Sequence, residues 1–151
     1  MSYLRNFGFN GPEEFACVGI NGKNSEFHAA MGLVNLKYAD TILKNRKDKF
    51  LYYTELLKGL DMEQQVINKH AGYNYSYFPI LLPSEDVLKR MIEELNKNWI
   101  LPRRYFYPSI HTQSFVEKCE CENSEDISKR ILCLPLYDAL TTEEMHLVIR
   151  V

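Results

Sequence analysis

Apolar residues recur at helical spacing along a long stretch in the first half of the chain. They form two runs of positions three or four apart, Phe27, Met31, Val34, Tyr38 and Ile42, then Phe50, Tyr53 and Leu57. The pattern predicts a helix over about residues 25–58, ended by Gly59. Such a helix is about 50 Å long, whereas a domain of this size is only about 40 Å across. We therefore expect either a kink near Asp40 or one helix end that packs on a surface outside this chain.

The second half of the chain predicts shorter elements, in which strands and helices alternate. In chain order these are a strand at 73–82, a helix capped by Ser84, a short strand at 99–101, a helix from Ser124 to about Leu132, a strand-like turn at 134–137 and a last helix whose capping box is formed by Thr141 and Glu144. This order predicts an α+β fold, a small two-layer domain with helices on a few-stranded, mostly antiparallel sheet, preceded by the long helix.

The first 24 residues show no steady period, yet they are rich in aromatic side chains. Phe7, Phe9 and Phe15 stand among glycines and a proline. A loop this aromatic needs a surface to lie on. We therefore divide the chain into a lead-in loop region, residues 1–24, and a small domain, residues 25–151.

Composition limits the classes of function. The chain has 151 residues, of which 46% are hydrophobic and 25% charged, as in an ordinary globular protein. Its net charge of −2 argues against a nucleic-acid binder, which usually carries a basic surplus. No apolar run reaches the length of a membrane span, and no signal-peptide pattern is present, so a cytoplasmic protein is expected.

The four cysteines do not predict a metal site. Only Cys119 and Cys121 are close in sequence, and their C-x-C spacing differs from the C-x-x-C spacing of common zinc sites. Scattered cysteines in a cytosolic chain are mostly reduced thiols. We therefore expect no metal.

A first candidate site lies where the long helix begins. Asn21, Lys23 and Ser25 stand with two glycines just before it, an arrangement that can hold an anion at a helix N-terminus. The alternative is a glycine-containing loop with a polar cap, because the spacing is not that of a P-loop. Both interpretations remain open on the residues alone.

A second candidate site is the stretch from Arg103 to His111. Arg103 and Arg104 precede three aromatic residues, the first of which is Tyr105, and this composition suits a phosphorylated ligand that carries a ring. The alternative is a strand with core aromatics and solvated arginines. His111 alone is more often structural than catalytic.

Three segments resemble the DegT/DnrJ/StrS family of PLP-dependent sugar aminotransferases. They are GINGKNSEFHAAMGLVNL (residues 19–36), LPRRYFYPSIH (residues 101–111) and ILCLPLYDALTTEEMHLVI (residues 131–149), and the resemblance runs collinearly over the whole chain. The chain departs from the family's pattern at Asn24 and at His28, where glutamine is usual.

The resemblance implies the C-terminal domain of a fold-type-I aminotransferase or a truncated reading frame. The family's Schiff-base lysine belongs to a large domain that precedes the segment seen here, and no lysine of this chain matches it. We therefore expect no catalytic residue in these 151 residues, no activity and no firm PLP binding by this chain alone.

The resemblance also implies roles for the two candidate sites in a homodimer. Asn21 would contact the PLP phosphate of the neighbouring subunit, with Lys23 and Ser25 supporting that loop. The substrate-binding residues would be Arg103, Arg104, Tyr105 and His111, which would lie near a nucleotide-linked, dTDP-type keto-deoxysugar. The amino group would come from glutamate through PLP.

Two other interpretations remain open. The chain could be a non-catalytic nucleotide-sugar-binding or protein-interaction module that keeps the fold. It could also be a subunit complemented by a separately encoded large domain.

Overall fold

The computed structural model describes residues 2–117 and 119–151; Met1 of the predicted lead-in region and Lys118 of the predicted domain lie outside the described residues. The helices are α1 (Ser2–Arg5), α2 (Glu26–Leu36), α3 (Ala39–Leu56), α4 (Glu85–Lys97), the short 3-10 helix η1 (Ile110–Thr112), α5 (Glu122–Arg130) and α6 (Thr142–Arg150). The strands are β1 (Glu63–Gln64), β2 (Phe78–Leu81) and β3 (Ile131–Leu134).

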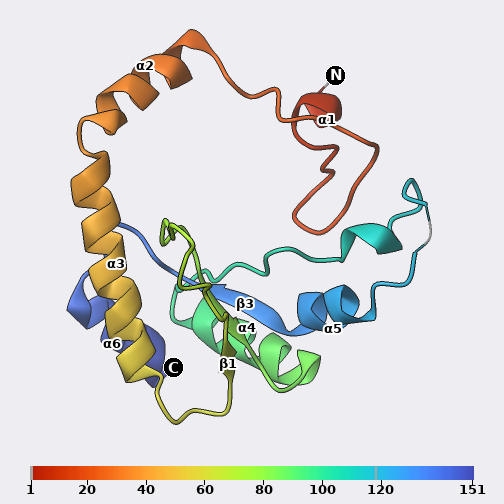
Figure 1. Cartoon of the computed structure of the whole chain (residues 1–151). Coiled ribbons are helices and arrows are strands. Elements are labelled where there is room, and N and C mark those ends of the chain that lie inside the picture. Colours follow the sequence, from red (N-terminus) through yellow and green to blue (C-terminus); the bar gives the residue numbers. More distant parts are fainter. Residues whose placement is uncertain (1, 118) are drawn as a thin grey trace.

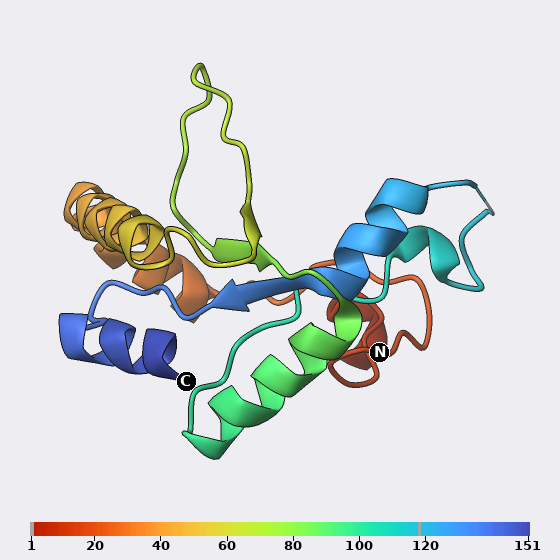
Figure 2. The ribbon, with the colours of Figure 1, turned by 90° about the horizontal axis from the view of Figure 1, so that it is seen from below.

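The three strands form one antiparallel sheet in the order β1-β2-β3. Phe78 pairs with Leu134 and Ile80 with Leu132, so the pairing places apolar side chains opposite one another. Helix α4 runs along one face of the sheet, while α3 and α6 lie side by side at one end and α5 at the other (Figures 1 and 2). This arrangement confirms the predicted fold class, helices on a small antiparallel sheet.

The hydrophobic core lies where the sheet meets α3, α4 and α6. Its fully buried side chains come from all of these elements and include Tyr53, Phe78, Ile80, Leu88, Leu95, Leu132 and Met145. On β2 the buried residues alternate with half-buried ones, as a strand with one core face requires. A polar contact joins α3 to α6 as well, because the Tyr52 hydroxyl lies 2.9 Å from His146 Nε2.

The long helix predicted over residues 25–58 is interrupted. Helix α2 ends at Leu36, and the amides of Lys37 and Tyr38 bond to carbonyls only three residues back, 3.1 and 2.9 Å away. The chain changes direction there, a few residues before Asp40, and α2 points away from the sheet (Figure 1). The expected kink thus resolves the length problem, and α3 ends before Gly59, whose φ is +86°.

The strand predicted over 73–82 is wrong in its first half. The Ser76 amide bonds to the Asn74 side chain, 3.1 Å away, and Tyr75 has a φ of +51°. An Asx turn and a left-handed residue cannot continue a strand. Pairing therefore begins only at Phe78.

The strand predicted at 99–101 is also wrong, because these residues end helix α4. The amide of Ile100 bonds to the carbonyl of Leu95, and that of Trp99 bonds to Asn96, each at 3.0 Å. This is a Schellman motif with Trp99 at the left-handed position, φ +60°. Ile100 and Leu95 are both buried, as the motif's hydrophobic contact requires.

The third strand of the sheet occupies residues predicted to end a helix and to form a turn. Helix α5 stops at Arg130, and Ile131–Leu134 pairs with β2 along its whole length. A short apolar run does not distinguish a strand from a buried helix end, so only the pairing settles the matter.

Two predicted helix caps are confirmed. The Ser84 hydroxyl accepts a bond from the Val87 amide at 3.3 Å, and Thr141 and Glu144 form the reciprocal capping box of α6. Among the described residues, no helix combines the length and the apolar character that crossing a membrane requires.

Candidate functional site

The lead-in segment folds back on itself in a crossing, where its backbone makes two close approaches, at Gly8 and at Gly19. The first candidate site follows this crossing. A Cβ added at Gly8 would lie 1.7 Å from the Cys17 carbonyl oxygen, and one added at Gly19 would lie 2.2 Å from the Gly8 amide nitrogen. Only glycine permits strands of backbone to approach so closely. The crossing brings Asn6 and Asn21 together as an isolated antiparallel bridge.

Asn21, Lys23 and Ser25 all lie on the surface where this crossing leads into α2. Lys23 Nζ stands 4.5 Å from the centre of the Phe7 ring. Ser25 is the N-cap residue, but its hydroxyl lies 2.8 Å from His28 Nδ1 and makes no capping bond to the backbone. The first amides of α2 are therefore left without a side-chain cap, which is what an anion at a helix N-terminus needs.

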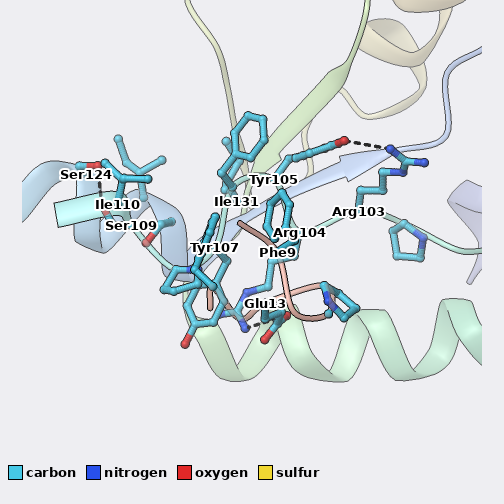
Figure 3. Close-up of a pocket in the computed structure, with 18 of the residues that line it drawn as sticks. Phe9, Glu13, Arg103, Arg104, Tyr105, Tyr107, Ser109, Ile110, Ser124 and Ile131 are labelled. Atoms are coloured by element: carbon cyan, nitrogen blue, oxygen red, sulfur yellow. Dashed lines mark hydrogen bonds and ion pairs between the residues drawn. The ribbon is translucent and has the colours of Figure 1, made fainter. Parts of the chain in front are cut away.

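The second candidate site lines a cavity of about 1060 Å³ between the lead-in segment and the sheet (Figure 3). Phe9, Glu13 and Phe15 of the lead-in segment form one side of it. Arg103, Arg104 and Tyr105 line it together with Tyr107, Ser109 and Ile110. Asn6 also lines it, so the Asn6–Asn21 bridge joins the two candidate sites, although Asn21 itself does not reach the cavity.

The two arginines point to opposite sides of this segment (Figure 3). Consecutive residues of an extended chain do so, and Arg103 bridges to Cys133 of β3 through two backbone hydrogen bonds of 3.0 and 2.8 Å. The exposed Arg103 side chain donates to the Tyr105 hydroxyl at 2.9 Å. It keeps its remaining donors toward the outside.

The Arg104 side chain, in contrast, is surrounded by other side chains of the chain. Its side chain is 11% exposed, it donates to a carboxyl oxygen of Glu85, and it lies 3.9 Å from Glu13 of the lead-in segment. Its guanidinium carbon stands 3.4 Å from the centre of the Tyr107 ring. The hydrogen bond from Arg104 holds the pKa of Glu85 below its usual range. Arg104 thus ties α4 and the lead-in segment to the cavity wall.

His111 lies just beyond the cavity and contacts it through Ser109. Ser109 Oγ stands 2.9 Å from His111 Nδ1 and 2.8 Å from Ser124 Oγ, and it is buried. His111 Nε2 lies 3.7 Å from Glu125. The pKa of Glu125 is lowered mainly by its hydrogen bond with Lys129 and further by His111. This polar network anchors the cavity wall to helix α5.

Several contacts of the site could not be predicted from the sequence. Glu13 and Glu85 read as ordinary surface carboxylates, and nothing in their spacing points to Arg104. Ser109 and Ser124 are 15 positions apart and meet only because η1 and α5 fold together. Tyr107 lies in the stretch from Arg103 to His111, but the contact of its ring with Arg104 was not expected from the sequence.

The arrangement can bind an elongated, anionic ligand with a ring. The cavity offers aromatic faces on both sides, and Arg103 supplies an exposed guanidinium at its rim. Hydroxyl groups of Ser109 and Ser124 offer further hydrogen bonds. Ser109 is paired with His111, but its hydroxyl is buried and also hydrogen-bonded to Ser124, so it anchors the cavity wall.

Solved aminotransferase structures share this fold of helices on a small antiparallel sheet. The family model of the DegT/DnrJ/EryC1/StrS aminotransferase family matches residues 1–151. The chain belongs to this family.

Two relatives are sugar transaminases. The chain is 35% identical to the dTDP-4-amino-4,6-dideoxy-D-glucose transaminase of Shigella dysenteriae, over 97% of this chain and 42% of that protein. It is 38% identical to the Escherichia coli transaminase of the same name, over 93% of this chain and 40% of that one. The chain thus spans about two-fifths of the length of the curated relatives it matches.

Solved structures agree on the fold. A PLP-dependent aminotransferase structure from Bacillus cereus ATCC 10987 superposes with a TM-score of 0.71 at 33% identity, covering 98% of this chain and 42% of that one. DesI, solved in the presence of its TDP-sugar product, superposes with a TM-score of 0.76 over 99% of this chain and 40% of its own; at 24% identity it supports the fold alone.

Proposed function

We propose that this chain is the small domain of an aminotransferase that transfers an amino group from glutamate to a dTDP-linked keto-deoxysugar. The observation that carries the proposal is the identity of 35% and 38%, over nearly the whole chain, to two transaminases named for a dTDP-amino sugar. In this proposal residues 1–24 lead in from the large domain, and residues 25–151 form the small domain.

In this proposal the cavity binds the nucleotide-sugar substrate. Arg103 offers a guanidinium to a diphosphate at the rim, and Tyr105 with the neighbouring aromatic rings offers faces for a base or a sugar. Arg104 and His111 act through their contacts with Glu85, Tyr107 and Ser109, and so position the wall. The carbonyl that accepts the amino group would then be the keto counterpart of the amino sugar named for the relatives.

The residues at the start of α2 fit a role toward a cofactor phosphate. Asn21 is exposed, the helix start has no side-chain cap, and Lys23 adds a positive charge close by. We propose that these groups bind the phosphate of PLP held by the neighbouring subunit of a homodimer, with Ser25 shaping the helix start. PLP, when bound, supplies the electron sink for amino-group transfer. The cytoplasmic location stays a prediction from composition.

The isolated chain is expected to lack the Schiff-base lysine. The test incubates the 151-residue chain with PLP, reduces it with borohydride and maps the labelled lysines by mass spectrometry. We expect scattered, substoichiometric labelling, because the lysines within residues 2–117 and 119–151 are exposed or half-buried and none of them lines the cavity. Stoichiometric labelling of one lysine would overturn the assignment.

A second function is favoured by one observation, that the lead-in segment and the segment from Arg103 to Ile110 line opposite sides of one cavity. Such a domain could bind a nucleotide sugar without transaminating it. Calorimetric titration with a dTDP-sugar separates the two cases. Tight binding by the isolated chain, lost in Arg103→Gln, supports the binding module, whereas the aminotransferase small domain is expected to bind weakly without the second half of its site.

A further inference from the structure

Two thiols lie close together in the loop that precedes α5. The Sγ atoms of Cys119 and Cys121 are 3.5 Å apart, with Cys119 exposed and Cys121 half-buried. The other two cysteines differ, because Cys133 is buried in β3 and Cys17 lies in the lead-in crossing. The candidate functional site makes no use of the Cys119–Cys121 pair.

The fold holds one thiol and leaves the other on the loop. Cys121 is the N-cap residue of α5, and its carbonyl accepts the Glu125 amide at 3.0 Å. Cys119 lies outside the helix. A disulfide has an S–S length of about 2.05 Å, so the sulfurs need to approach by only about 1.5 Å. Movement of the exposed loop residue can supply this without disturbing the helix.

We propose that Cys119 and Cys121 form an oxidation site at which a small disulfide converts the two thiols into an intramolecular disulfide. One thiolate attacks the oxidant and forms a mixed disulfide, releasing one thiol of the oxidant. The other thiolate attacks the protein sulfur of that mixed disulfide and releases the second thiol. The two protons and two electrons lost by the cysteines are recovered in the two released thiols.

The surroundings distinguish this pair from the buried Cys133. Burial raises the pKa of the Cys133 thiol to about 11, so it stays protonated and shielded. The contact between the two sulfurs, 3.5 Å apart, raises the pKa of Cys121. In the sequence around the pair, three glutamates, Glu117, Glu120 and Glu122, outnumber the single basic residue, Lys118. A cationic disulfide is therefore the preferred oxidant over an anionic one at low salt.

The proposed disulfide sits at the start of a helix that contacts the candidate site. Ser124 and Glu125, three and four residues beyond Cys121, face Ser109 and His111. The oxidation site itself does not depend on the proposed function, since its chemistry uses only the two thiols.

The experiment treats the folded 151-residue chain with cystamine, a cationic disulfide, then alkylates the remaining thiols and digests with trypsin. Cleavage after Lys118 and Lys129 releases both cysteines in one peptide, apart from Cys17 and Cys133. We expect this peptide to lose both alkylation sites and two hydrogen atoms, and to regain them on reduction. Oxidised glutathione, which is anionic, should react more slowly, and 1 M salt should remove most of that difference.

Matched variants decide the outcome. Cys17→Ser should oxidise as the parent chain does, whereas Cys119→Ser and Cys121→Ser should each accumulate a mixed disulfide with cystamine and no internal bond. The parent chain unfolded in urea should form the internal bond more slowly, because the fold no longer holds the sulfurs together. A stable mixed disulfide on the folded parent, a dimer linked between chains, or equal rates in urea would each overturn the proposal.

Discussion

Arg103 and Arg104 are neighbours of the same type, yet the structure gives them different surroundings. Arg103 is exposed, and its side chain donates a hydrogen bond to Tyr105, while Arg104 is nearly buried between Glu85, Glu13 and the ring of Tyr107. The sequence presents them as a pair of guanidinium groups for phosphate. In the structure, Arg103 lies at the rim of the cavity, whereas Arg104 holds the cavity wall in place.

Replacing each arginine by glutamine tests this difference. Arg104→Gln leaves Glu85 without its partner and removes the contact with Tyr107, so we expect a loss of about 1–3 kcal/mol in the free energy of unfolding. Arg103→Gln, the matched control, should cost less than about 0.5 kcal/mol because its side chain is exposed. Urea unfolding measures both. Equal losses would contradict the assignment.

The contribution of the Arg104–Glu85 pair should depend on pH. The pKa of Glu85 is lowered in the folded protein, mainly by the hydrogen bond from Arg104. The stabilisation is therefore complete above the ordinary pKa of glutamate and is lost as the pH falls through the lowered value. The stability difference between the parent chain and Arg104→Gln should shrink between about pH 6 and pH 3. An unchanged difference over this range would show that Glu85 is not the partner that matters.

At the scale of elements, Trp99 at the end of α4 adopts a backbone conformation that tryptophan does not favour. Trp99 adopts a φ of +60° and is 93% exposed, so it takes the left-handed position of the Schellman motif without packing against the core. Glycine occupies this position at most such helix ends because it has no Cβ.

Trp99→Gly should therefore stabilise the chain, although glycine also increases the entropy of the unfolded state. The balance of the two effects is a gain of about 0.5–1 kcal/mol. Trp99→Ala, which keeps a Cβ, is the control and should gain nothing. Circular dichroism is the suitable probe, because Trp99 is the only tryptophan of the chain. A loss of stability in Trp99→Gly would mean that the indole makes a stabilising contact.

The elements also show what can be predicted from sequence. The caps at Ser84 and Thr141 and the end near Gly59 depend on neighbouring residues, and each was predictable. Strand β3 was not, because Ile131–Leu134 becomes a strand only through its pairing with β2. The contacts of the cavity wall likewise depend on residues that are distant in sequence. Its residues Arg103 to Tyr105 were identified by composition, whereas their partner Glu13 comes from a segment about 90 positions away.

At the scale of the whole molecule, α2 contributes nothing to the core. None of its residues is buried, and its exposed apolar side chains are Phe27 at 89%, Leu36 at 70%, Leu33 at 68%, Met31 at 60% and Val34 at 49%. Monomeric proteins rarely leave this many large apolar side chains of one helix exposed. In the proposed enzyme the large domain or the second subunit would cover it.

The isolated chain should therefore self-associate through α2. Phe27→Glu combined with Met31→Gln should raise the monomer fraction in sedimentation or light scattering. Thermal stability should change by less than about 0.5 kcal/mol, because both side chains are exposed. Val66→Gln removes an equally exposed apolar group outside α2 and should leave association unchanged. A purely monomeric parent chain would contradict this expectation.

The most direct test of the central claim joins this chain to a cofactor domain. A chimera replaces the part of the Escherichia coli relative that the chain matches, 40% of that protein, by these 151 residues. Bound PLP, measured by its absorbance, shows that the chimera has folded. The account predicts amino transfer from glutamate to the keto counterpart of the relatives' dTDP-amino sugar, reduced at least about tenfold in Asn21→Ala, which corresponds to about 1.4 kcal/mol. A chimera that binds PLP but transfers no amino group to this sugar would contradict the account.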